Sequence, residues 1–194
     1  MPVSLLLQTE RTFLRPFEPA DLPALQTYLN HPEVAGRRYI PWGFSEDLPL
    51  SAKQVEGIYN KWCEGENEFH LAIVSQDKQE VIGHTELDWG WDPHCPFVAV
   101  LIAASHQRQG YGSEVLSLLM RHLFENTPAH NVHSWMADWN QAARRFAEVH
   151  GFLESGCSRH EGLRQGKYYD AILVDILRPE WQASQGGKRH ATRG

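Results

Sequence analysis

The residue types and spacing best suited to chemistry lie in a glycine turn just past the middle of the chain. Gln107-Arg108-Gln109-Gly110-Tyr111-Gly112 follows the apolar run 97–104 and precedes a helical pattern over 113–124. The first turn of a helix leaves backbone N–H groups unpaired, and the helix dipole adds partial positive charge there. Glycine accepts positive φ and lets a phosphate come close to the backbone. The turn therefore predicts a site for a phosphate-bearing ligand.

Two common nucleotide motifs do not fit this turn. A P-loop requires a lysine directly after its last glycine, and none follows Gly110 or Gly112. A dinucleotide fingerprint requires a third glycine where this chain has Val115. An ordinary tight turn between a strand and a helix is the remaining alternative.

The spacing Gln-x-x-Gly-x-Gly at 107–112 resembles the acetyl-CoA signature of the GNAT superfamily of N-acetyltransferases. A second block, Asn140-Gln-Ala-Ala-Arg-Arg-Phe-Ala-Glu-Val-His-Gly-Phe152, resembles the Asn…Gly-Phe helix of the same family, in its expected place downstream. The resemblance implies an acetyl-CoA-dependent N-acetyltransferase with acetyl-CoA as cosubstrate. It also implies an α/β (α+β) fold of the GNAT acyl-CoA N-acyltransferase type, whose mixed central sheet splays open at the cofactor between flanking helices.

The resemblance also assigns residues to the cofactor. The amides that follow Gln107 would hold the pyrophosphate, the strand before the turn would pair its backbone with the pantetheine arm, and Asn140 would contact the cofactor or merely cap its helix. The cofactor-binding residues implied in this way are Leu101, Ile102, Ala103, Gln107, Arg108, Gln109, Gly110, Tyr111, Gly112, Ser113 and Asn140.

Catalytic residues are less well marked. In the family that this chain resembles, a tyrosine one residue past the Phe146 position often protonates the leaving thiolate, and this chain has Ala147 there. The chain in this respect resembles the branch of ribosomal-protein-alanine N-acetyltransferases, which commonly has a small residue at that position. We expect Phe146 to face the core with Ala142 and Val149. Candidate bases are Glu86, then His84 and Asp88, which share one face of a predicted strand because strand side chains alternate. That face either lines a groove or is the wet side of the sheet.

The acceptor is an amine, and the resemblance leaves its identity open. A protein N-terminus, a small amine such as a polyamine, amino acid or aminoglycoside, and a non-catalytic acyl-CoA-binding module are the alternatives. Trp42, Trp89 and Trp91 are candidates for shaping an acceptor pocket.

Composition narrows the class of protein. The net charge is −6, with −8 on residues 1–100 and +2 on residues 101–194, so the glycine turn lies in the more basic half. Neither nucleic-acid binding nor a membrane span is indicated. Three isolated cysteines favour a reducing, cytoplasmic location, and the eleven histidines show no metal-binding spacing. We expect a monomer or homodimer.

Hydrophobic periodicity predicts the order strand, two helices, three strands, helix, strand, helix, two strands. The strands are expected at 13–17, 69–75, 81–89, 97–103, 133–138, 152–158 and 169–177. Ser51 and Gln54 form a predicted capping box, and residues 31–50 form a predicted loop. We expect one domain over residues 1–180 and a disordered tail over 181–194.

Overall fold

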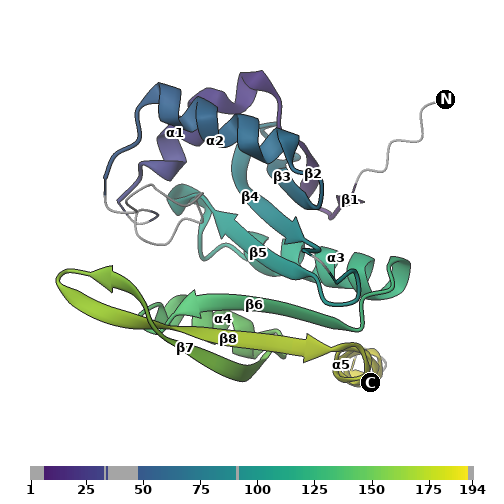
Figure 1. The fold of residues 1–194 in the computed structure, drawn as a ribbon. Coiled ribbons are helices and arrows are strands. Elements are labelled where there is room, and N and C mark those ends of the chain that lie inside the picture. Colours follow the sequence, from purple (N-terminus) through teal and green to yellow (C-terminus); the bar gives the residue numbers. More distant parts are fainter. Residues whose placement is uncertain (1–6, 33, 35–47, 91, 192–194) are drawn as a thin grey trace. The chain divides into compact units, whose positions relative to one another are not determined.

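The computed structural model describes residues 7–32, 34, 48–90 and 92–191 (Figure 1). Trp42 and Trp91, and most of the predicted loop over 31–50, lie outside the described residues. The chain divides into two compact units, which are described in turn: Met1–Asp88 with Ala99–Arg121, and Trp89–Val98 with His122–Gly194.

The first unit is built on antiparallel strands that follow one another in the sheet. These are β1 (Leu7–Gln8), β2 (Thr12–Pro16), β3 (Glu68–Ser75) and β4 (Val81–Asp88), with β5 (Phe97–Ile102) next in order. The N–H of Ala103 donates to the carbonyl of Ile82 at 2.8 Å. A Cβ at Gly83 would collide with the carbonyl oxygen of Leu101. Glycine at position 83 therefore lets the backbones of β4 and β5 approach closely.

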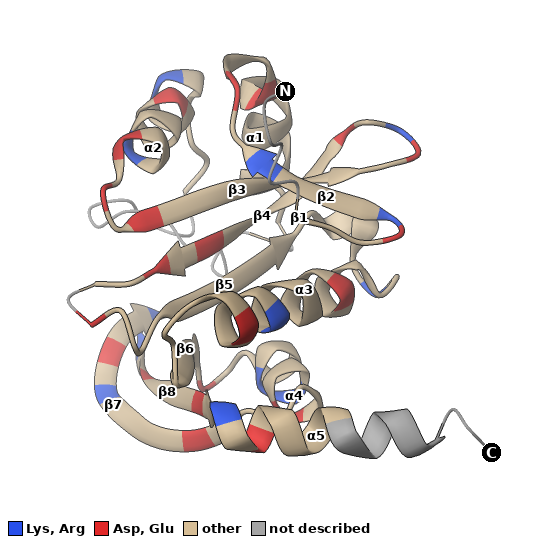
Figure 2. Cartoon of the chain, turned by 90° about the vertical axis from the view of Figure 1, so that its right-hand side faces the viewer, with Lys and Arg blue, Asp and Glu red and all other residues tan. Residues whose placement is uncertain are grey.

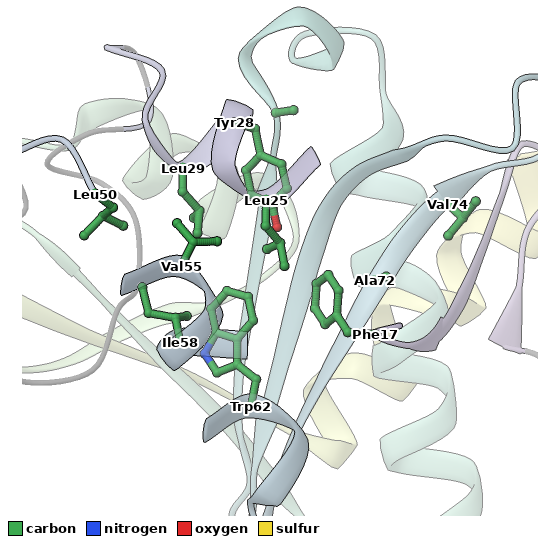
Figure 3. Packing of buried hydrophobic residues seen from close by; sticks show 11 residues of the cluster. Phe17, Leu25, Tyr28, Leu29, Leu50, Val55, Ile58, Trp62, Ala72 and Val74 are labelled. Atoms are coloured by element: carbon green, nitrogen blue, oxygen red, sulfur yellow. The ribbon is translucent and has the colours of Figure 1, made fainter. Parts of the chain in front are cut away.

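Two helices cover one face of these strands (Figure 1). A 3₁₀ turn, η1 (Pro19–Asp21), leads into α1 (Leu22–Leu29), and α2 (Ala52–Glu64) follows. The predicted capping box of α2 is confirmed, since Ser51 and Gln54 exchange side-chain and backbone hydrogen bonds. Figure 3 shows the core between helices and strands, where Leu25, Leu29 and Ile58 are fully buried. This core fixes the helices over the face of β3 and β4 that carries the candidate bases.

Helix α3 (Tyr111–Asn126) begins in the first unit and ends in the second. Val115, Leu119 and Leu123 are fully buried, which confirms the stripe predicted from their spacing of four. The turn before it contains a 3₁₀ segment, η2 (Ala104–His106).

The second unit has strands β6 (Asn131–Ala137), β7 (Leu153–Arg164) and β8 (Lys167–Leu177), in the order β6-β8-β7, and helices α4 (Gln141–Val149) and α5 (Arg178–Ala191). Both strand pairs are antiparallel, and Phe97 at the start of β5 pairs in parallel with His133. The predicted splay of the sheet at the cofactor stays a prediction.

Two parts of the second unit differ from the sequence-based expectation. The connection expected between residues 158 and 169 is a two-residue hairpin turn, Gln165 and Gly166, because both residues adopt positive φ, as a tight primed turn requires. Residues 178–191 form α5, where a tail disordered from 181 was expected. Arg178 donates to the carbonyls of Thr127 and Ala129, and Trp181 packs on Phe124, so long-range contacts hold the first turn of this helix.

Candidate active site

The glycine turn adopts a fixed, partly left-handed conformation. Arg108 and Gly110 have positive φ of 59° and 88°, and the Gln107 side chain donates to the carbonyl of Ile102 at 2.8 Å. The Gln109 side chain donates to the carbonyl of Ser105 at 3.0 Å. Both glutamine side chains therefore hold the loop itself, and Arg108, Gln109 and Gly110 are exposed residues.

Free backbone donors gather at the start of α3. The N–H of Glu114, in the first turn of the helix, donates to the carbonyl of Gly110 at 3.1 Å. Among the described residues, no hydrogen bond engages the N–H groups of residues 108–113. Unpaired amides at a helix N-terminus, with the partial positive charge of the dipole, fit a pyrophosphate.

Arg11 is a residue of this turn that the sequence reasoning missed. Its guanidinium donates to the carbonyl of Gln109 at 3.0 Å and to Oε1 of Glu114 at 2.6 Å, and it lies over the ring of Tyr111 at 4.5 Å. The pKa of Arg11 is raised by the hydrogen bond to Glu114. No sequence pattern marks this contact, because about a hundred residues separate its partners.

An open groove of about 560 Å³ adjoins this contact, on the side of α3 that faces the turn between β1 and β2. Thr9, Ser113, Ser117 and Arg121 are among the residues that line it. Ser113 is thus reachable beside the helix N-terminus.

Asn140 and residues 101–103, which the resemblance also assigns to the cofactor, already make some hydrogen bonds within the protein. The side chain of Asn140 accepts from the N–H of Ala143 at 3.2 Å, so it caps α4, and its amide nitrogen stays available. The N–H of Ala103 is engaged by Ile82, and the carbonyl of Ile102 by Gln107. Contact of Leu101, Ile102 and Ala103 with a pantetheine arm stays a prediction.

The three candidate bases lie on one face of β4, as predicted, and that face is not the wet side of the sheet. His84 and Glu86 are 2% and 3% exposed, and Tyr28 of α1 and Trp62 of α2 pack on His84. Their cross-strand partners on β3 are Ala72 and His70, and Asp88 pairs with Glu68. The two strands thus carry a ladder of three pairs, Glu68–Asp88, His70–Glu86 and Ala72–His84, which runs from half-exposed to fully buried. Figure 2 shows acidic residues at the start of β3 and toward the end of β4, and no Lys or Arg on either strand.

Glu86 has the properties of a poised base. Burial, and then the charges of Glu68 and Asp88, raise the pKa of its carboxyl to about 8. Its Oε2 is buried and has no hydrogen-bond partner among the described residues. A buried carboxyl without a partner is costly, and such groups concentrate at functional sites.

His84 is less suited to this role. Nδ1 is hydrogen-bonded to the hydroxyl of Tyr28 at 3.0 Å, and burial raises the pKa of that phenol well above its usual value. Burial, and then His70, lower the pKa of His84 to about 3. Its ring packs beside Trp62 at 4.6 Å. His84 is therefore a neutral, tethered core residue.

The prediction for the buried face of α4 was wrong. Val149 is 74% exposed and Ala142 is exposed, whereas Ala147 is 7% exposed. Phe146 is half-buried and packs against the ring of His150 with centroids 4.4 Å apart, and Nδ1 of His150 contacts the Phe146 carbonyl at 2.7 Å. The apolar side of the helix is turned by one residue, so Ala147 fills a packed position.

Comparison with known proteins agrees with this architecture. Residues 11–153 match the model of the acetyltransferase (GNAT) domain family, and the match runs through both units. The chain therefore belongs to the GNAT acetyltransferases, and its fold is the mixed α+β fold of that family. It is an acetyl-CoA-dependent N-acetyltransferase by family, and the glycine turn supplies donors that fit the cofactor.

Individual relatives are distant. An uncharacterized N-acetyltransferase of Bacillus subtilis (strain 168), YoaA, is 22% identical over 184 residues, which is 90% of this chain and 97% of YoaA. A GNAT acetyltransferase structure from Bacillus anthracis is 18% identical with a TM-score of 0.76, covering 90% of this chain and 99% of that one. The Vibrio cholerae spermidine N-acetyltransferase, solved in complex with CoA and spermine, is 22% identical with a TM-score of 0.74 over 90% of this chain and 99% of its own.

No helix within the described part of the chain is long and apolar enough to cross a membrane.

Proposed function

We propose that this chain acetylates a primary amine, with Glu86 as the general base and the glycine turn as the pyrophosphate site. The observation that carries the proposal is the Glu86 carboxyl, which is buried, unpartnered at Oε2 and raised in pKa to about 8. A general base works best when its pKa lies near the operating pH. His84 is a weaker candidate for the general base, because Tyr28 tethers its ring. Asp88 is also weaker, because it lies at the half-exposed end of the ladder.

The cofactor would be held by the residues of the turn. The amides of Arg108, Gln109, Gly110, Tyr111, Gly112 and Ser113 would receive the pyrophosphate, and the side chain of Asn140 and the backbone of Leu101, Ile102 and Ala103 would hold the rest. When bound, acetyl-CoA supplies a thioester carbonyl, to which a neutral amine adds as the C–S bond breaks.

Glu86 prepares the amine for that addition. An acceptor arrives as an ammonium ion, and its positive charge lowers the pKa of the neighbouring carboxyl. The resulting carboxylate takes one proton from the ammonium and leaves the nitrogen lone pair free. kcat/KM, which reports the pKa of the free enzyme, should therefore increase with pH up to about 8.

The acidic pair at the open end of the ladder favours one class of acceptor. Glu68 and Asp88 are cross-strand partners beside Glu86, and neither strand carries a cation. Two carboxylates beyond the base would attract a second ammonium group. We therefore place a small amine with more than one positive charge first, and a protein N-terminus, the acceptor of the ribosomal-protein-alanine branch, second. The three free cysteines are in keeping with a reducing, cytoplasmic location.

Release of free thiol from acetyl-CoA tests the proposal against a panel of amines. Spermidine and other polyamines, single amino acids, an aminoglycoside and peptides beginning with Ala or Ser make up the panel. The Glu86→Gln variant should lower kcat by at least about a hundredfold with little change in the KM for acetyl-CoA. Equal turnover in wild type and Glu86→Gln across the pH range would remove Glu86 from the mechanism, and no turnover with any amine would favour a binding module.

A further inference from the structure

His70 stands directly opposite Glu86 in the ladder, and nothing in the sequence analysis singled it out. The two residues are Cα partners across β3 and β4, so their side chains leave the sheet on the same face. His70 is 7% exposed, and its ring stacks on Trp62 with centroids 4.8 Å apart and planes at 12°. Trp62 thus fixes the plane of the imidazole.

Each of the two side chains has one buried polar atom without a partner. These atoms are Oε2 of Glu86 and Nδ1 of His70, and neither bonds any described residue. Leaving a buried polar atom unpaired destabilises the native state. A bridging water molecule between neighbouring polar groups removes that cost, and such waters are regular parts of protein interiors.

The other nitrogen of His70 faces the exposed end of the ladder. Nε2 lies 3.6 Å from Oε2 of Glu68, whose side chain is 52% exposed. The side chains of Glu86, His70 and Glu68 therefore form a row that leads from a buried carboxyl to a carboxylate in contact with solvent.

We propose that His70 is a positioning residue that conducts the acceptor's proton from Glu86 to solvent through Glu68. This rests on the proposed function of Glu86. The ammonium gives a proton to the Glu86 carboxylate and becomes the neutral amine. The protonated Glu86 passes that proton through one water to Nδ1 of His70, while the Nε2 proton moves to the Glu68 carboxylate. Glu68 releases it to water, so one proton leaves and every group regains its charge once the imidazole tautomer resets.

The surrounding charges are consistent with a relay that never forms a stable imidazolium. Burial lowers the pKa of His70 to about 4, so its ring is neutral near pH 7. The titratable groups around the pair are Glu68 and Asp88 at the open end, with His84 and the phenol of Tyr28 at the closed end. A neutral imidazole accepts at one nitrogen and donates at the other, as the row requires.

The first experiment uses the protein without cofactor. Nitrogen-15 NMR of the imidazoles should show His70 as the Nε2–H tautomer, neutral down to about pH 4. Glu86→Gln should shift its Nδ1 resonance, whereas Glu56→Gln on the exposed side of α2 should not. A His70 that carries its proton on Nδ1, or that titrates near pH 6.5, would overturn the relay.

The second experiment follows turnover with the best amine of the panel. His70→Gln and His70→Asn should lower kcat at least tenfold while acetyl-CoA affinity is unchanged, and high imidazole buffer should restore part of the loss. Glu68→Gln, at an exposed position, should show a smaller loss of the same kind, with Glu66→Gln as its matched control. An unchanged kcat in both His70 variants counts against the relay. So does a loss of kcat that imidazole buffer fails to restore in His70→Gln, His70→Asn and Glu68→Gln alike. If wild type acetylates no amine, the proposed function fails, and the NMR result still decides whether His70 and Glu86 are coupled.

Discussion

Nε of Arg11 donates to Oε1 of Glu114 at 2.6 Å, which ties the turn between β1 and β2 to the first turn of α3. The same guanidinium holds the carbonyl of Gln109 and covers the ring of Tyr111. It therefore neutralises a carboxylate beside the proposed pyrophosphate site and braces the loop that supplies the amides.

Arg11→Ala should weaken acetyl-CoA binding by about tenfold, equivalent to about 1.4 kcal/mol. The reason is that Glu114 would face the phosphates without its counter-charge. Calorimetric titration measures the change. The double variant Arg11→Ala/Glu114→Gln should recover part of the affinity, and Lys78→Ala, which removes an exposed ion pair with Glu80, is the control. An affinity that is the same in all four proteins would show that the contact is unrelated to the cofactor.

Gly110 offers a graded test of the same site. Its φ is +88°, and an added Cβ would lie 3.0 Å from Nη2 of Arg11, so Gly110→Ala should cost about 1 kcal/mol of stability and reduce acetyl-CoA affinity. Gly110→Asp and Gly112→Asp should also place a negative charge against the phosphates. Acetyl-CoA should then raise the Tm of wild type but not of the aspartate variants. A thermal shift of full size in both aspartate variants would move the cofactor elsewhere.

The raised pKa of Glu86 gives the free energy of unfolding a defined pH dependence. The native carboxyl keeps its proton up to about pH 8, whereas the unfolded carboxyl loses it near 4.5, so the native state binds more protons between these values. The contribution of Glu86 to the free energy of unfolding should therefore be greatest below about pH 4.5. It should fall by a few kcal/mol as the pH increases to about 8.

Urea unfolding of wild type and Glu86→Gln at several pH values measures this effect. The variant should lack the decline, so the difference between the two proteins should grow with pH. Glu56→Gln should track wild type. Parallel curves for wild type and Glu86→Gln would show that the carboxyl is ionised in the native state at neutral pH.

Ala147→Tyr tests the corrected orientation of α4. The position is 7% exposed, so a phenol ring there should overpack the helix contact and lower the free energy of unfolding by about 1–3 kcal/mol. Val149→Tyr on the exposed side of the same helix is the matched control and should change stability little. A stable Ala147→Tyr protein with higher turnover would instead identify a chain that lacks its general acid.

The sequence predicted features whose signal lies within one helix or strand. It did not predict features that depend on contacts with residues elsewhere in the chain. The spacing of Val115, Leu119 and Leu123 marks the buried side of α3, and Ser51 with Gln54 marks the start of α2, because both signals lie within one element. On α4 the short helix offers too few apolar residues to fix its orientation, and Ala142 and Val149 were assigned to the wrong side. The β7–β8 turn was missed because Gln165 adopts positive φ, which is uncommon for glutamine.

The residues of the candidate site also differ in whether the sequence could predict them. Alternation along β4 is enough to place His84, Glu86 and Asp88 on one face, but not to say whether helices cover that face. Arg11 and His70 became visible through the pairing of segments far apart in the chain. A charged residue in a turn and a histidine inside an apolar strand carry no mark of such partners.

The bonds within the glycine turn also bear on how quickly acetyl-CoA binds. Gln107, Gln109 and Arg11 hold the loop in shape through protein contacts alone, so its ordering entropy is lost when the chain folds and not when the ligand arrives. Association should then behave as a single collision step, with an observed rate that increases linearly with acetyl-CoA concentration and shows no plateau from loop closure.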